Sequence, residues 1–213
     1  MDDKKINGKK LQGAETKKKI IECADALFRE YGFENVSVDS IVEKAGISKG
    51  GFYVHFESKD ALISVLIAEY VKRLELGYKA FIGALPDGVE TSALLLSLVG
   101  KISDVITDNI GYNLIKLAYR IQIDQNINTG VLLSYGRDIY TLFDELIKRG
   151  VRRGEFKAEL DTKASAEQFV TVLRGFTYEW CIRYPEFQLK DELLRHFNML
   201  LSGIKNQRAF QKP

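Results

Sequence analysis

The feature that most constrains the fold of this chain is a pair of short apolar patterns that meet at Gly46. The first pattern places its apolar residues on one helix face and stops at the glycine, which is a common helix terminator. In the second, Phe52 and Phe56 lie four residues apart and so face the same side of a helix. Ser37 and Ser48 are good N-cap residues for the two patterns. The segment therefore predicts two short helices joined by a tight corner.

Longer helical patterns flank this pair on both sides. On the N-terminal side, the apolar residues between Thr16 and Tyr31 share one helix face, and Gly32 ends the pattern. On the C-terminal side, Ser58 caps a fourth pattern that continues to Ile82. The 213 residues include only three prolines and few alternating β-branched runs. We therefore predict an all-α protein.

Beyond a turn at Pro86-Asp87-Gly88, the chain consists of further amphipathic patterns without an internal repeat. They are separated by Gly111, Gly130, Gly154 and Pro185. The last two patterns carry apolar stripes that are rich enough to pack against a partner subunit. The residues expected in such a dimer interface are Phe169, Leu173, Leu194, Phe197 and Leu201.

The net charge of +2 is too small to make the whole chain basic, so an anionic partner must be met by a local patch. Residues 1–15 contain several lysines but no apolar cluster able to order them, which predicts a flexible basic arm. Lys17 and Lys18 follow in the first turn of a helix, where the helix dipole disfavours cations and a bound phosphate would favour them. We expect them to contact DNA, although a solvated charged face would give the same pattern.

The second short helix has the polar tip that reading a DNA major groove requires. Its first residues, Ser48, Lys49, Gly50 and Gly51, are short, flexible or cationic and can reach base edges or allow close backbone approach. Lys49 is the best candidate for a guanine contact. The two glycines weaken a helix, so either DNA contact favours them or the short helix tolerates them through its packing.

Other polar residues around this tip suit contacts to phosphates. Tyr53 and His55 can donate hydrogen bonds to the DNA backbone, although His55 could equally have a structural role. Ser37 and Ser40 at one helix start, and Lys59 at another, would hold phosphates on either side. These contacts position a protein on DNA rather than specify a sequence.

Several motifs in this region occur together: Tyr31-Gly32, Ala45-Gly46-Ile47-Ser48, GGFYVHF at 50–56 and Ser58-Lys59-Asp60-Ala61-Leu62. In combination they resemble the DNA-binding segment of the tetracycline-repressor (TetR) family of bacterial regulators, over roughly Thr16 to Ala80. Asp39 and Gly51 depart from the family pattern. The resemblance implies a three-helix DNA reader, a connecting helix, and a larger helical domain that binds a ligand and dimerises through its last two helices.

On this basis we expect a flexible arm at 1–15, a DNA-binding domain at 16–76 with its helix-turn-helix motif at about 37–56, and a ligand-binding and dimerisation domain at 77–207. The expected partners are double-stranded operator DNA, a second copy of the chain and an apolar or aromatic small molecule. The resemblance implies a repressor that its ligand releases from a palindromic operator. An activator of the same fold remains an alternative, as does a helical binding protein or enzyme with a structural helix-turn-helix.

Aromatic residues in the second half could line an apolar ligand pocket, or they could be ordinary core. The residues considered for the pocket are Tyr112, Tyr119, Tyr135, Tyr140, Phe143, Phe176 and Trp180. No nucleophile elbow, phosphate loop or metal-ligand spacing is present, so we expect no enzyme, no cofactor and no metal site. Cys23 and Cys181 lack paired spacing, and no apolar run is long enough to span a bilayer. We expect a cytoplasmic protein at the bacterial nucleoid, with no membrane contact.

Overall fold

The computed structural model describes residues 2–86, 88–124, 134 and 136–206, with side chains from residue 11 onward. All regular elements in these ranges are helices, which confirms the all-α prediction. Apart from them, Phe156 and Lys205 form an isolated β-bridge. Contacts divide the described residues into two compact units. Unit 1 comprises residues up to Glu69 together with 121–124, and unit 2 comprises the rest, so that the boundary lies inside helix α4 (Lys59–Gly83).

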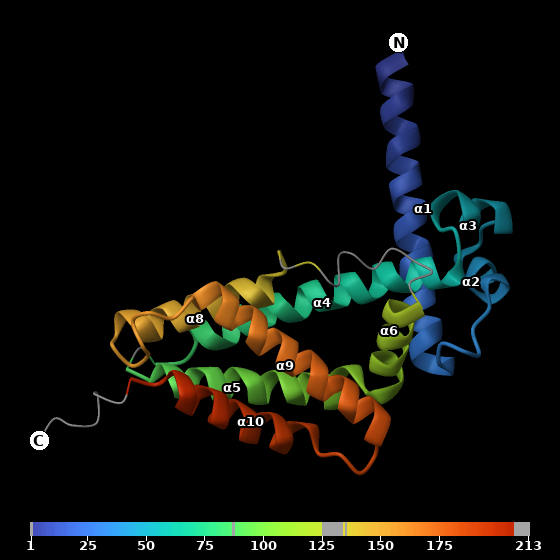
Figure 1. The fold of residues 1–213 in the computed structure, drawn as a ribbon. Coiled ribbons are helices and arrows are strands. Elements are labelled where there is room, and N and C mark those ends of the chain that lie inside the picture. The colour runs from blue at the N-terminus through green and yellow to red at the C-terminus, as the bar shows by residue number, and fades with distance from the viewer. Residues whose placement is uncertain (1, 87, 125–133, 135, 207–213) are drawn as a thin grey trace, which may run out of the picture. The chain divides into compact units, whose positions relative to one another are not determined.

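Unit 1 contains α1 (Asp2–Tyr31), α2 (Val38–Ala45), α3 (Lys49–His55) and the start of α4. Helix α2 contacts both α1 and α3, as Figure 1 shows. The unit has an apolar core of its own, to which all four helices contribute. Its buried residues are Ile20, Ala24, Leu27, Val36, Ile41, Val42, Phe52, Phe56, Leu62 and Leu66.

The first turns of α1 differ from the sequence-based expectation. We expected a flexible arm at 1–15 and a helix from Thr16, whereas the structure continues the helix back to Asp2. These turns extend beyond α2 and α3 (Figure 1). Extending an existing helix costs far less than nucleating one, and lysine is a good helix former. The segment 16–31 therefore provides the nucleus from which the lysine-rich turns propagate.

The helix ends in unit 1 form at the caps that the sequence predicted. The Ser37 side chain accepts a hydrogen bond from the Ser40 backbone N–H, and the Ser40 Oγ accepts one from the Ser37 backbone N–H, which completes a capping box at the start of α2. Gly46 ends α2 in the left-handed conformation, with φ of 62°. Ser48 and Ser58 cap α3 and α4 by accepting from backbone N–H groups three residues on.

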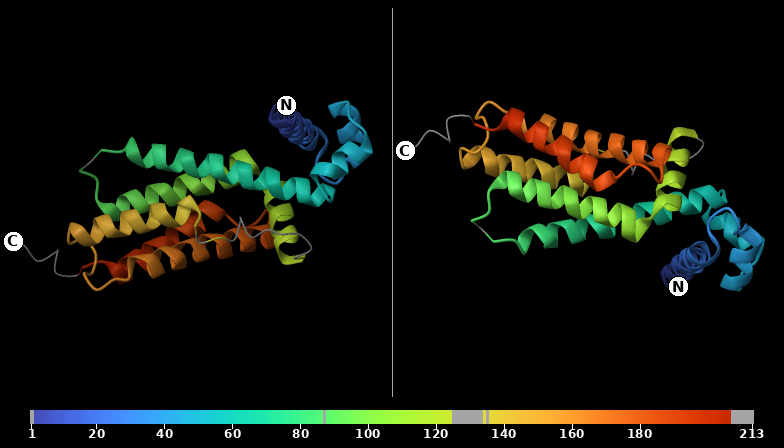
Figure 2. Two further views of the ribbon diagram at one scale, coloured as in Figure 1. Left: turned by 90° about the horizontal axis from the view of Figure 1, so that it is seen from above. Right: turned by 90° about the horizontal axis from the view of Figure 1, so that it is seen from below.

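Unit 2 contains the remainder of α4, α5 (Thr91–Asp104), the π-helix η1 (Val105–Ile110), α6 (Tyr112–Asp124, up to Arg120), α8 (Asp138–Arg152), α9 (Thr162–Arg183) and α10 (Leu189–Ile204). Helix α8 packs against α9 and α5, and α10 packs against α5 and α9. Figure 1 and both views of Figure 2 show these four helices side by side. Gly111, with φ of 80°, separates η1 from α6.

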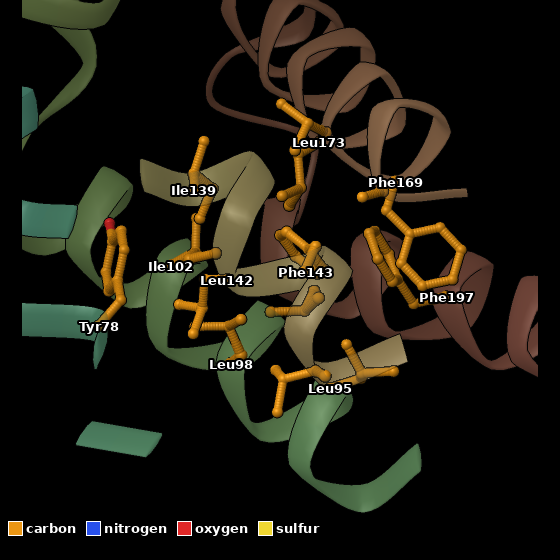
Figure 3. Packing of buried hydrophobic residues seen from close by; sticks show 14 of the residues in the cluster. Tyr78, Leu95, Leu98, Ile102, Ile139, Leu142, Phe143, Phe169, Leu173 and Phe197 are labelled. Carbon is orange, nitrogen blue, oxygen red and sulfur yellow. The ribbon is translucent and has the colours of Figure 1, made fainter. Parts of the chain in front are cut away.

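The centre of this bundle is a cluster of phenylalanine rings (Figure 3). The Phe143 ring centroid lies 5.9 Å from that of Phe169 and 6.3 Å from that of Phe197. All three side chains are buried, as are Leu173 and Leu201. Four of the five residues assigned to a dimer interface, all except Leu194, are therefore core residues of a single chain, and that assignment was wrong for them. Leu194 itself is partly buried against the same core.

The reason for this correction is that the apolar stripes of α9 and α10 face the core of their own chain. The most apolar face of a helix in a globular unit turns toward its own core first, because that burial stabilises the single chain. The apolar residues that α9 and α10 leave exposed are Tyr178 and Ile182 on α9 and Met199 on α10.

Candidate DNA-binding surface

The tip of α3 is held at a fixed angle by apolar contacts behind it. Phe52 is fully buried, and Phe56 directly after the helix is 4% exposed. The corner before α3 is tied by the backbone N–H of Ile47, which donates to the carbonyl of Val42 at 3.0 Å. These contacts leave the opposite side of α3 free to meet a ligand. The core contacts thus fix the position of α3 itself, so the side chains predicted to meet bases or phosphates need no core contacts of their own.

Most residues predicted to read bases are exposed at this tip. Ser48, Lys49 and Gly50 are exposed and Gly51 is half-buried. A Cβ atom at Gly50 would have ordinary room, with its nearest neighbour Ser48 Oγ at 3.9 Å. Packing within the protein therefore does not require glycine at this position. The two explanations given by the sequence, close approach of DNA to the backbone and tolerance of glycine by the short helix, both agree with this geometry.

Tyr53 lies where its hydroxyl could reach the phosphate backbone of DNA. Its side chain is 50% exposed, while its ring edge packs on Phe52 at 5.3 Å between centroids. His55 lies elsewhere: it is half-buried, and its Cε1 would be 3.9 Å from a Cβ atom at Gly13 of α1. The structure therefore places His55 beside α1 and Tyr53 on the open face of α3.

Lys59, which we predicted to hold a phosphate, has partners within the protein. Its ammonium group donates to the backbone carbonyls of Phe33 at 3.1 Å and Val36 at 2.8 Å, and it lies 4.1 Å from the centroid of the Phe33 ring. The turn between α1 and α2 exposes carbonyls with no helical partner, and the lysine satisfies them. Lys59 thus joins α4 to this turn.

The two lysines of α1 that were predicted to contact DNA, Lys17 and Lys18, are both exposed. Lys17 lies with its ammonium 5.5 Å from the centroid of the Phe56 ring, just after α3, and Lys18 approaches Glu22 at 3.7 Å. Ser37 is exposed and Ser40 half-buried, and their hydroxyls are used in the capping box of α2. Lys17 therefore lies close to the end of α3, and the two serines lie at the start of α2.

Lys49 has an intramolecular partner that sequence analysis missed. Its ammonium lies 2.8 Å from Oδ1 and 3.1 Å from Oδ2 of Asp39 in the first turn of α2. The hydrogen bond to Asp39 raises the pKa of Lys49. Asp39 stood out in the sequence only as a departure from the TetR family pattern. The ten-residue separation between the two gave no sign that they pair, because only the corner at Gly46 brings them together.

In unit 2, the residues considered for a ligand pocket fall into different places. Tyr140 and Phe143 are buried in the core, and Phe176 packs against Phe187 and His196. Tyr135 lies outside the described residues. Of the remaining three, Trp180 is buried in the same core and Tyr112 packs against it. Tyr112 contacts Trp180 and stacks on Tyr184, and Tyr119 packs on Tyr178 and donates to the carbonyl of Arg174 at 2.7 Å.

Unit 2 also contains an ion pair that sequence analysis did not identify. Arg137, at the start of α8, donates through Nε to Oε1 of Glu75 on α4 at 2.9 Å. The Glu75 side chain is 7% exposed and that of Arg137 is 22% exposed. Burial raises the pKa of the nearby Tyr78, and the negative charge of Glu75 raises it further. A carboxylate between Leu74 and Tyr78, on the apolar face of α4, was the signal that could have identified this pair.

The described residues contain neither a candidate metal site nor a candidate membrane-spanning helix. They contain no group of three or more histidine, cysteine, aspartate or glutamate side chains that could hold a metal ion. No helix among them is both long and apolar enough to cross a bilayer.

Comparison with known proteins gives matches at three levels. Residues 20–66 match the family described as bacterial regulatory proteins, tetR family. The HTH-type transcriptional regulator YdgC of Bacillus subtilis (strain 168) is 25% identical over 79% of this chain and 82% of its own length. The HTH-type transcriptional repressor BepR of Brucella suis biovar 1 (strain 1330) is 26% identical over 92% of both chains. The FadR structure of Thermus thermophilus, a repressor in complex with lauroyl-CoA, is 18% identical with a TM-score of 0.69, over 87% of this chain and 93% of FadR.

Proposed function

This chain belongs to the tetR family of bacterial regulatory proteins, and from this premise we propose that it is a homodimeric repressor that a small molecule releases from its operator. It is a DNA-binding transcriptional regulator. The observation that supports α3 as its reading element is the contrast between the two sides of that helix. Phe52 is fully buried, whereas Ser48, Lys49, Gly50 and Tyr53 are exposed. Such a helix can enter a groove without disturbing its own core.

A gel shift with the DNA upstream of the chain's own gene tests this surface. Tyr53→Phe removes one hydroxyl that can donate to a phosphate, so we expect affinity for all sequences to fall by about 5-fold. Lys49→Ala should instead relax the preference at one base pair. Lys44→Ala, a change at an exposed lysine in the last turn of α2, serves as the control. Wild-type binding by both test variants would remove α3 from the interface.

The lysine-rich first turns of α1 form the second part of the proposed interface. They carry positive charge beyond α2 and α3, where it can meet phosphates that the α3 tip does not reach. Deleting residues 2–15 should make the dependence of affinity on salt concentration less steep. Removal of one bound phosphate lowers the slope of log affinity against log salt by about 0.9. An unchanged slope would show that α1 contacts no phosphate.

We propose that a second copy of the chain covers the exposed apolar residues Tyr178, Ile182 and Met199 of α9 and α10. A two-fold symmetric dimer would set its two α3 helices about 34 Å apart, to match successive major grooves of a palindrome. Ile182→Lys should convert the dimer to a monomer in analytical ultracentrifugation. Leu76→Lys, at a residue of α4 that is 53% exposed, is the matched control and should remain dimeric.

We propose that the effector has a long apolar part and binds within unit 2. The support is two aromatic contacts between α6 and α9, Tyr112 with Trp180 and Tyr119 with Tyr178, because aromatic side chains commonly line apolar ligand sites. The lauroyl-CoA complex of the related FadR structure makes this compound the first probe. It should raise the Tm and dissociate the operator complex, because release requires tighter binding to the DNA-free form. Lauroyl-CoA that leaves both unchanged would exclude it as the effector.

A further inference from the structure

The ion pair between Asp39 and Lys49 lies within the proposed reading surface. Lys49 is the first residue of α3 and Asp39 the second residue of α2, so the pair connects the beginnings of both helices. The side chain of Asp39 is 70% exposed and that of Lys49 is 54% exposed, and 2.8 Å separates Lys49 Nζ from Asp39 Oδ1. An ammonium donor and a carboxylate acceptor are thus presented to the outside next to each other.

A carboxylate at this place is unfavourable for general DNA binding. It repels phosphates and cancels the charge of the lysine that would otherwise attract them. Exposed ion pairs also contribute little to protein stability, so stability alone does not account for the pair. The carboxylate becomes favourable only where the DNA offers a hydrogen-bond donor beside an acceptor.

A G·C base pair offers this arrangement in the major groove. Guanine presents the acceptors O6 and N7, and cytosine presents its N4 amino group as a donor. Guanine O6 and cytosine N4 are hydrogen-bonded to each other and lie about 2.9 Å apart. This spacing matches the 2.8 Å between Lys49 Nζ and Asp39 Oδ1. The two pairs can therefore face each other, with each donor next to an acceptor.

We propose that Asp39 and Lys49 together read one G·C base pair in each operator half-site. Lys49 donates to guanine, and Asp39 accepts from the amino group of the paired cytosine. This inference rests on the proposed DNA-binding function and assigns Asp39 as a specificity-determining residue. With an A·T pair in the same position, the carboxylate would meet the O4 acceptor of thymine and be repelled.

The test is selection of bound fragments from a random pool of duplex DNA, using the full chain. The wild type should select two-fold symmetric sites with a constant G·C pair in each half. Asp39→Ala and Lys49→Ala should both lose preference at that same pair and keep it elsewhere. Asp25→Ala removes an equally charged residue from an exposed ion pair, with Arg29 on α1, and should select the same sites as the wild type.

Gel shifts on the selected site then measure how much affinity each protein loses when only that base pair of the DNA is changed. Changing the G·C pair to A·T should weaken wild-type binding by roughly 10-fold or more, and Asp39→Ala binding by much less. Asp39→Ala should also bind unrelated A·T duplexes more tightly than the wild type does, because the repelling charge is gone. Asp39→Asn gives a second variant of nearly the same shape, and Tm values of all variants should equal that of the wild type.

The outcomes separate this inference from the function on which it rests. If Asp39→Ala or Asp39→Asn selects the wild-type sequence, or if the two test variants lose preference at different base pairs, the shared reading of one pair is wrong and operator binding stands. If the wild type shows no salt-dependent DNA binding and selects no sequence, the proposed function itself fails.

Discussion

The ring of Phe156 occupies the space that a side chain at Gly150 would need. A Cβ atom built on Gly150 would overlap the Cγ, Cδ2 and Cε2 atoms of this ring, which is fully buried. The backbone N–H groups of Glu155 and Phe156 both donate to the Gly150 carbonyl, at 2.9 and 3.2 Å. Glu155 then caps α5 by accepting from the Thr91 N–H at 2.6 Å. The chain after α8 is thus folded tightly back on the helix.

Gly150→Ala should lower the free energy of unfolding of unit 2 by about 1–3 kcal/mol, because the methyl group must displace a packed ring. Urea unfolding followed by the fluorescence of Trp180, the one tryptophan in the chain, measures it. Gly77→Ala is the control, since a Cβ atom at this exposed position of α4 has no neighbour within 4 Å. It should stabilise by up to about 1 kcal/mol. Equal effects of the two changes would contradict this account of Gly150.

Replacing Lys59 by methionine should destabilise unit 1. The change keeps most of the side-chain length but removes the hydrogen bonds to the Phe33 and Val36 carbonyls, each made by a charged donor. We expect a loss of about 2 kcal/mol, seen as faster amide hydrogen exchange in α2 and α3. Lys44→Met, at an exposed residue of α2, should leave the exchange rates unchanged. A normal exchange pattern for Lys59→Met with a reduced salt slope of DNA binding would restore the phosphate role.

The Glu75–Arg137 pair should show strong coupling. Arg137→Met leaves the carboxylate of Glu75 buried without its partner, so we expect unit 2 to lose on the order of 3 kcal/mol. The double change Glu75→Leu with Arg137→Met removes both charges and should be close to the wild type or more stable. Urea unfolding of both single variants and the double variant gives the coupling energy. Additive losses would mean that the two side chains act independently.

Cys181 should react slowly with alkylating reagents. Burial raises the pKa of its thiol from 9.0 to about 11, so at pH 8 the reactive thiolate is about 100-fold scarcer than in the unfolded chain. Because the folded chain holds this proton more tightly than the unfolded chain does, the protein loses stability as the pH rises from 9 toward 11. Mass spectrometry of iodoacetamide-treated protein, folded and in urea, measures both rates. Equal rates at pH 8 would show that the thiol is not shielded.

The features predicted correctly from sequence are those decided by neighbouring residues. Capping by Ser37 and Ser48 and the left-handed turn at Gly46 depend on a few adjacent groups, so short motifs encode them. The inward direction of Phe52 and Phe56 follows from their spacing in the same way. This local encoding is why the proposed DNA-reading segment could be recognised as a unit.

The errors came from interactions between distant residues. Lys49 and Lys59 are both lysines at helix starts, and the sequence suggested DNA contacts for both, to guanine for Lys49 and to phosphate for Lys59. Only the fold shows that one faces Asp39 at the surface while the other satisfies carbonyls of a turn 23 to 26 residues away. The apolar stripe with Phe169 and Leu173 presented a similar difficulty. Periodicity identifies an apolar face but cannot tell whether its partner is the same chain or another.

The buried residues of the apolar cluster that α1, α2, α3 and α4 form in unit 1 all lie between Ile20 and Leu66, a continuous stretch of the chain. This cluster contains no residue that is synthesised after Leu66, and short sequence separations favour fast folding. We therefore expect the three-helix reader to fold while the ribosome is still making the rest of the protein. A chain stalled well beyond Leu66 should already resist protease over residues 20–66. An incomplete chain released after that point would then carry a folded DNA-binding element without the unit proposed to control it.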